Sequence, residues 1–144
     1  MLLRRLAVLL ALVLAPPAYA LEVQSCDDAH AGIGELVHPV SANQRTFADE
    51  RVLIYAIDMV EPVCCAGGVA VVMPDAEDAV GGNKCFAVIG VASVQVSKAT
   101  AQQDADKTLR ISIPTRVFNG AEDAIDGDPI KLRIELEGSA LTLE

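Results

Sequence analysis

The strongest constraint on the fold is a strict alternation of residue types in the last third of the chain. In Leu109–Val117 an apolar residue or threonine occupies every second position, and arginine, serine or proline stands between. Ile130–Leu136 repeats the pattern with charged residues in the intervening positions. Because successive side chains of a strand point to opposite faces, both segments are predicted to be β-strands with one buried face and one solvent-exposed face. Pro114 lacks a backbone N–H, which predicts an edge position or a β-bulge.

Further strands are predicted upstream. Arg51–Val60 is apolar at both alternating sets of positions, which is typical of a central strand covered on both faces. Val69–Met73, Cys85–Ser97 and Ala140–Leu143 are also strand candidates, and Ala99–Lys107 is expected to form a turn or a long hairpin loop. Short strands separated by turn signals, without alternating helices, predict an all-β, antiparallel β-sandwich, with a small β-barrel as the alternative.

The first twenty residues have the pattern of an export signal. Met1–Ala20 contains two arginines, the apolar run Leu6–Leu14, a Pro-Pro pair and a closing Ala-Tyr-Ala. The apolar run is shorter than the roughly 20 residues that span a bilayer. We therefore expect 1–20 to be a cleaved signal peptide and 21–144 to be a single β domain, periplasmic or secreted, with no transmembrane segment after cleavage.

Four cysteines, Cys26, Cys64, Cys65 and Cys85, would then lie in an oxidising compartment, which favours two disulfides. Neighbouring strand residues point to opposite faces, so Cys64 and Cys65 are expected to reach different partners. One would bond to Cys26 and the other to Cys85, and which takes which stays open. The glycine pair that follows, at 67 and 68, permits a sharp turn or a bulge.

The charge of the chain restricts its partners. Twenty acidic residues against eleven basic ones give a formal net charge of −9, and the signal contributes two arginines and no acids. Such a balance argues against nucleic acid and against an anionic membrane surface, and it permits a cationic partner or a divalent cation. The chain has no tryptophan and three phenylalanines, which disfavours recognition by aromatic stacking.

Two acidic segments are calcium candidates, because calcium takes several oxygen ligands from a flexible loop. Their members are Asp75, Glu77 and Asp78 in one segment and Glu122, Asp123, Asp126 and Asp128 in the other. The spacing is not that of an EF-hand, and Asp-Gly and Asp-Pro pairs are also typical of tight turns. Copper is a second metal hypothesis, on the soft ligands Met59, Met73, His30 and His38.

The sequence offers no catalytic constellation. It lacks a G-x-S-x-G nucleophile motif and a C-x-x-C motif, so we expect a protein that is not an enzyme and holds no cofactor beyond the calcium hypothesis. The prediction is an exported, non-catalytic β-sandwich that serves as a binding or structural module for a protein partner. Its sharper version is an inhibitor-like binder of a cationic cell-wall hydrolase such as lysozyme, because opposite charge speeds encounter. A periplasmic metal-binding protein, for calcium or copper, is the alternative.

Overall fold

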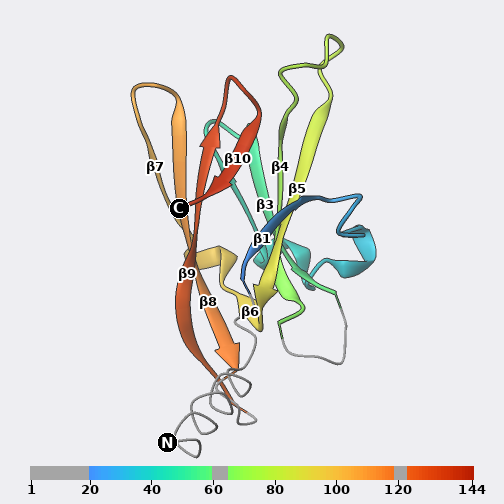
Figure 1. Cartoon of the computed structure of the whole chain (residues 1–144), viewed down its shortest axis with the longest axis vertical. Coiled ribbons are helices and arrows are strands. Elements are labelled where there is room, and N and C mark those ends of the chain that lie inside the picture. The colour runs from blue at the N-terminus through green and yellow to red at the C-terminus, as the bar shows by residue number, and fades with distance from the viewer. Residues whose placement is uncertain (1–19, 60–64, 119–122) are drawn as a thin grey trace, which may run out of the picture.

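The chain forms two antiparallel sheets that pack face to face (Figure 1). The computed structural model describes residues 20–59, 65–118 and 123–144, so nearly all of the predicted signal peptide, Cys64 and Glu122 lie outside the described residues. Each sheet is hydrogen-bonded within itself, which confirms an all-β sandwich and not a closed barrel. No helix in the described part of the chain is long and apolar enough to cross a membrane.

The first sheet contains five strands in the order β1-β5-β4-β3-β2. Their bounds are β1 Glu22–Ser25, β2 Gln44–Phe47, β3 Val52–Asp58, β4 Gly67–Pro74 and β5 Asn83–Val91. β3 lies between two neighbours and has buried residues on both faces, as its two-sided apolar pattern predicted. The register between β4 and β5 shifts between Gly67 and Gly68, which confirms the expected bulge.

The second sheet follows the order β10-β9-β8-β6, and β7 also pairs with β8. Its strands are β6 Ser93–Val94, β7 Thr100–Gln103, β8 Thr108–Phe118, β9 Ala124–Glu135 and β10 Ala140–Leu143. The predicted strand at 85–97 is therefore divided. β5 ends in the first sheet, and the chain then enters the second sheet as β6 and a short 3-10 helix, η3 (Val96–Lys98).

A bulge interrupts the long β8–β9 pair where both strands carry a proline. Ile113 pairs with Ile130 and Thr115 pairs with Gly127, so Pro114 stands opposite two residues, Asp128 and Pro129. Neither proline can donate to the ladder, and the bulge removes the need for those two bonds. The Thr115 hydroxyl donates to the Asp128 carbonyl at 2.8 Å. Pro114 thus marks a bulge within a strand that is paired on both sides, and the edge alternative is wrong.

The core lies between the two sheets and is almost wholly aliphatic. Its fully buried members include Ile54, Val69, Val71 and Val88 from the first sheet and Ile111, Ile113, Ile130, Leu132 and Ile134 from the second. A smaller cluster covers the outer face of the first sheet, where Ile57, Ala70 and Ala87 pack beneath the segment that contains Cys26 and Ala29. Among the described residues no such cluster lies on the second sheet, and its outer face carries the alternating charged residues of β8 and β9.

The disulfide connectivity differs from the prediction. Cys26 bonds to Cys85, with the two Cα atoms 5.3 Å apart. The cause is the pairing of β1 with β5, which places Ser25 opposite Phe86 and continues into a Cys26 N–H to Cys85 carbonyl bond of 3.0 Å. Cys65 precedes β4, seven residues before Val72, the β4 residue opposite Cys85. At about 3.4 Å per residue it lies on the order of 20 Å from Cys85, beyond the reach of a disulfide. The expected bonds from Cys26 and Cys85 to Cys64 and Cys65 are therefore wrong, and the structure contains one disulfide within its described residues.

Candidate functional site

Four hairpin loops meet at one end of the sandwich, at the top of Figure 1. They are residues 48–51 between β2 and β3, 75–82 between β4 and β5, 104–107 between β7 and β8, and 136–139 between β9 and β10. Antiparallel pairing alone places the first two loops at the same end of the first sheet's strands, and the last two loops at the same end of the second sheet's strands. Binding residues are often carried on loops that a rigid scaffold holds together.

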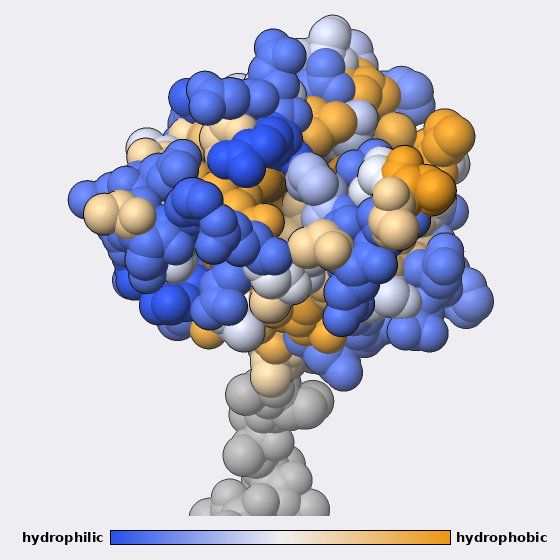
Figure 2. Space-filling model, turned by 90° about the horizontal axis from the view of Figure 1, so that it is seen from above, coloured by the Kyte–Doolittle hydropathy of each residue, from blue (hydrophilic) through white to orange (hydrophobic). Residues whose placement is uncertain are grey.

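These loops concentrate negative charge. We define the acidic end as residues 48–51, 75–84, 104–107 and 135–139. Its carboxylates are Asp49, Glu50, Asp75, Glu77, Asp78, Asp104, Asp106, Glu135 and Glu137, and its cations are Arg51, Lys84 and Lys107. Nine acids against three cations leave a formal −6. Arg110 pairs with Asp104 and Arg133 pairs with Glu135, so the surface carries −4 when these two arginines are counted with it. Figure 2 views the molecule from this end, which is mostly hydrophilic with apolar patches between, and Val80 at its tip is 92% exposed.

In the β4–β5 loop the carboxylates hold the backbone of their own turn. Asp78 accepts the Val80 and Gly82 N–H groups, both at 3.0 Å. Asp75 accepts the Glu77 N–H at 2.9 Å and pairs with Lys84 at 3.2 Å. The hydrogen bond from the Glu77 N–H is the main cause that holds the pKa of Asp75 below its ordinary value. The carboxyl of Asp75 therefore stays ionised well into the acidic range.

The two loops of the second sheet are organised in the same way. Asp106 accepts the Thr108 N–H at 3.0 Å, which lowers the pKa of this carboxyl. Lys107 pairs with Glu137 across the gap between the loops, and this hydrogen bond lowers the pKa of the Glu137 carboxyl. Because both shifts stabilise the charged form, Asp106 and Glu137 remain ionised at neutral pH.

Ser139 joins the loops of the two sheets. Its hydroxyl accepts the Ala76 N–H at 2.6 Å and donates to the Pro74 carbonyl at 2.7 Å. The residue is 3% exposed and connects the β9–β10 loop to the β4–β5 loop. Together with the Lys107–Glu137 pair, Ser139 therefore links three of the four loops, those at 75–82, 104–107 and 136–139, into one surface across the sandwich.

We expect Ser139→Ala to lower the free energy of unfolding by about 1–3 kcal/mol, because it removes two part-buried hydrogen bonds, one from the Ala76 N–H and one to the Pro74 carbonyl, each worth about 0.5–1.5 kcal/mol. Denaturant unfolding measures this loss. Ser97→Ala is the control, because Ser97 is exposed, and it is expected to change stability by less than about 0.5 kcal/mol. Equal effects of the two substitutions would contradict the bridging role of Ser139.

The structure separates the two predicted calcium segments. Asp75, Glu77 and Asp78 belong to the acidic end, whereas Asp126 and Asp128 lie near the start of β9, at the opposite end of the sandwich. The segment expected to be a loop is therefore a strand from Ala124 onward, with Asp123 just before it and Glu122 outside the described residues. Asp126 faces Arg116 across the ladder.

The described residues contain no group of three or more His, Cys, Asp or Glu side chains placed to hold a metal ion. The copper candidates are also dispersed. Met73 is buried between the sheets, Met59 packs on the outer face of the first sheet, and His30 and His38 are exposed. The calcium and copper hypotheses stay predictions that rest on the sequence.

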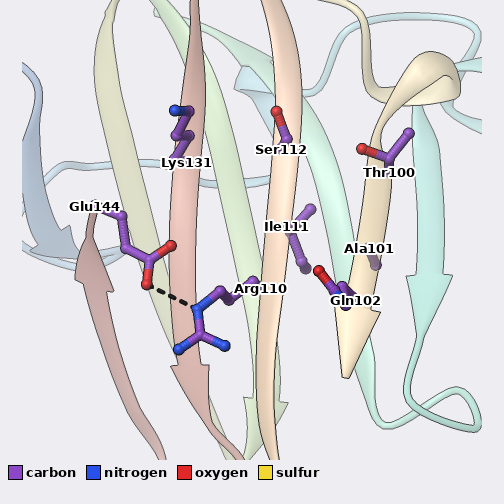
Figure 3. A pocket seen from close by; sticks show the side chains of 8 residues that line it. All are labelled: Thr100, Ala101, Gln102, Arg110, Ile111, Ser112, Lys131 and Glu144. Atoms are coloured by element: carbon purple, nitrogen blue, oxygen red, sulfur yellow. Dashed lines mark hydrogen bonds and ion pairs between the residues drawn. The ribbon is translucent and has the colours of Figure 1, made fainter. Parts of the chain in front are cut away.

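A polar hollow of about 450 Å³ lies on the outer face of the second sheet (Figure 3). Arg110 crosses its floor and is held by Glu144, with Nε and Oε1 3.0 Å apart, and by Asp104. Ser112 and Lys131 stand opposite each other in the β8–β9 register, yet no hydrogen bond joins these two described side chains. The hollow is lined mainly by polar and charged side chains.

An apolar hollow of about 250 Å³ lies on the outer face of the first sheet, beside the disulfide. Tyr55, Val72 and Cys85 line its floor, and Leu36 and Ile33 form part of its wall. Ile33 is 86% exposed. This hollow is lined mainly by apolar residues, and the sequence pattern gave no sign of it.

Comparisons with protein families, with curated proteins and with solved structures find no match to this chain. The chemistry of the surface is therefore the basis for assigning a function. Sequence reasoning found the acidic segment at 75–78 but missed that the loops at 48–51, 104–107 and 136–139 join it. The signal that could have shown this is that acidic residues recur in or next to each of these hairpin turns, and hairpin turns of consecutive antiparallel hairpins lie at the same end of a sheet.

Proposed function

We propose that this protein is an exported, non-catalytic β-sandwich binding module whose partner is a cationic protein. The acidic end is the binding surface. The partner class is a basic cell-wall hydrolase of the lysozyme kind, which the module would bind in the manner of an inhibitor. The Cys26–Cys85 disulfide supports a place in an oxidising compartment, where such a partner is found.

The observation that carries this proposal is the convergence of nine carboxylates, eight from four loops and Glu135 from the end of β9, onto one end of the molecule. A surface of one charge sign steers an oppositely charged partner and raises the association rate, more than it adds to the final affinity. The loops are held by their own hydrogen bonds and by Ser139, so little conformational freedom is lost when a partner docks. Exposed Val80 adds an apolar contact within the charged surface.

The test uses lysozyme as the probe and isothermal titration calorimetry at low and at high salt. We expect binding that weakens steeply with salt, because the Debye length falls from about 30 Å at 0.01 M to about 10 Å at 0.1 M. The triple variant Asp49→Asn/Glu50→Gln/Glu77→Gln removes three charges from the acidic end. It should weaken binding about tenfold at low salt.

The matched control is Asp123→Asn/Asp126→Asn/Asp128→Asn, which removes the same three charges from the opposite end of the sandwich. It should leave binding within about twofold of the unmodified protein. Absence of any binding to lysozyme would overturn the proposal for this class of partner. Equal weakening by the two triple variants would show that net charge alone acts and that the acidic end is not a site.

A further inference from the structure

The strand β7 is a sheet edge that the fold leaves uncovered. It pairs with β8 on one side, and on its other side no strand of the described chain pairs with it (Figure 1). All four of its residues, Thr100 to Gln103, are exposed. The other edges are better covered. β10 and β1 contact each other, and Arg45 of β2 donates to the carbonyls of Ser97 and Ala99.

The unpaired backbone groups of β7 can be assigned from the ladder. Asp104 donates its N–H to the Thr108 carbonyl, which makes these two residues a hydrogen-bonded pair. In an antiparallel ladder every second pair exchanges hydrogen bonds, so the next such pairs are Gln102 with Arg110 and Thr100 with Ser112. The N–H and carbonyl groups of Ala101 and Gln103 therefore point away from β8. Two donors and two acceptors in one row are a template for another strand.

The side chains of this edge do not protect it. Natural edge strands are commonly blocked by lysine, proline, an inward charge or a bulge. Thr100, Ala101, Gln102 and Gln103 include none of these, and the β7–β8 register is regular. Charged residues stand only beyond the strand, with Lys98 before it and Asp104 and Asp106 after it.

We infer that β7 pairs antiparallel with β7 of a second copy of this chain. A two-fold axis through Gln102 would place Ala101 of each copy opposite Gln103 of the other. The two outward N–H groups and two outward carbonyls of each edge then satisfy those of its partner, which gives a self-complementary interface. The two second sheets join into one continuous sheet across the dimer.

The charges that flank the strand fit this orientation. Antiparallel pairing brings Lys98 of one copy alongside the Asp104 and Asp106 end of the other, twice in each dimer. Parallel pairing would instead set Lys98 beside Lys98 and Asp104 beside Asp104. The same two-fold axis directs the acidic ends of the two copies in opposite directions, because β7 runs toward the acidic end in each. Their mutual repulsion is therefore small, and both ends stay open to a partner.

The test is sedimentation velocity of the exported protein between about 10 μM and about 1 mM, the range in which a small strand-pairing interface associates. We expect a dimer that forms within this range. Ala101→Pro removes an outward N–H without breaking a bond to β8, and it should leave a monomer at every concentration. Ala101→Ser keeps the N–H and should dimerise like the unmodified protein.

A pair of charge variants tests the orientation. Lys98→Glu should lower the association constant about tenfold, because it places a carboxylate beside Asp104 and Asp106 of the other copy. Lys131→Glu makes the same change in net charge on β9, away from the edge, and should have less than a twofold effect. A protein that stays monomeric up to the highest concentration, or a dimer that tolerates Ala101→Pro, overturns the inference. Equal effects of the two charge variants overturn the antiparallel arrangement. Lysozyme binding by the Ala101→Pro monomer separates this inference from the proposed function.

Discussion

Replacement of Cys26 and Cys85 by alanine is expected to lower the free energy of unfolding by about 4 kcal/mol. The bond joins residues 59 positions apart in the sequence, and the entropy lost by the unfolded chain on closing a loop of this size accounts for the figure. Domains of this size have total stabilities of about 5–15 kcal/mol. The disulfide therefore accounts for a large share of what keeps β1 at the edge of the first sheet and the segment after it on the outer face of that sheet.

Guanidinium unfolding of the oxidised protein, of the reduced protein and of the Cys26→Ala/Cys85→Ala variant measures this loss, and the last two should agree. The control is Cys64→Ala/Cys65→Ala. A disulfide between two adjacent cysteines would close almost no loop of the unfolded chain. The Cys64→Ala/Cys65→Ala change should therefore lower the free energy of unfolding much less than loss of the Cys26–Cys85 bond. If the control costs as much as removal of the Cys26–Cys85 bond, the connectivity described here is wrong and the pairing first expected from the sequence is restored.

The two cysteine pairs illustrate where sequence reasoning fails. β8 and β9 were predictable because their alternation is long and one-sided, so a single face must be buried. β1 is four residues long and partly polar, which gives no comparable signal. Its place beside β5 is a long-range pairing, and the Cys26–Cys85 bond follows from that pairing alone. The rule that neighbouring strand residues point to opposite faces, applied to Cys64 and Cys65, could not predict the Cys26–Cys85 bond.

The acidic end shows the same division between local and non-local information. The hydrogen bonds of Asp75 and Asp78 within their turn are local, and the turn was predictable from its residues. The meeting of that turn with the loops at 48–51 and 136–139 depends on the order of strands in two sheets. Asp126 and Asp128 were assigned to a loop because Gly127 and Pro129 are turn residues. The bulge opposite Pro114 instead lets these residues continue a strand.

Gly68→Ala is the second substitution for which we expect a large effect, a loss of about 3 kcal/mol in the free energy of unfolding. A Cβ at this position would lie 2.0 Å from the Val88 carbonyl oxygen and 2.9 Å from the Ile89 Cα. Both are backbone atoms of β5, so relief of the overlap requires β4 and β5 to move apart. That movement would open the contact between Val69 and Val88, two fully buried residues of the core.

Gly34→Ala is the matched control, because a Cβ there meets no atom within 4 Å. Urea unfolding of both variants measures the difference, and Gly34→Ala should change stability by less than about 0.5 kcal/mol. A neutral Gly68→Ala would mean that β4 and β5 are not in close register at this point, and the bulge between Gly67 and Gly68 would have to be reassigned. The difference expected between Gly68→Ala and Gly34→Ala arises from the glycine pair Gly67-Gly68 at the start of β4. Their role is to let the backbone of β4 approach β5 closely where the β3–β4 hairpin enters the sheet.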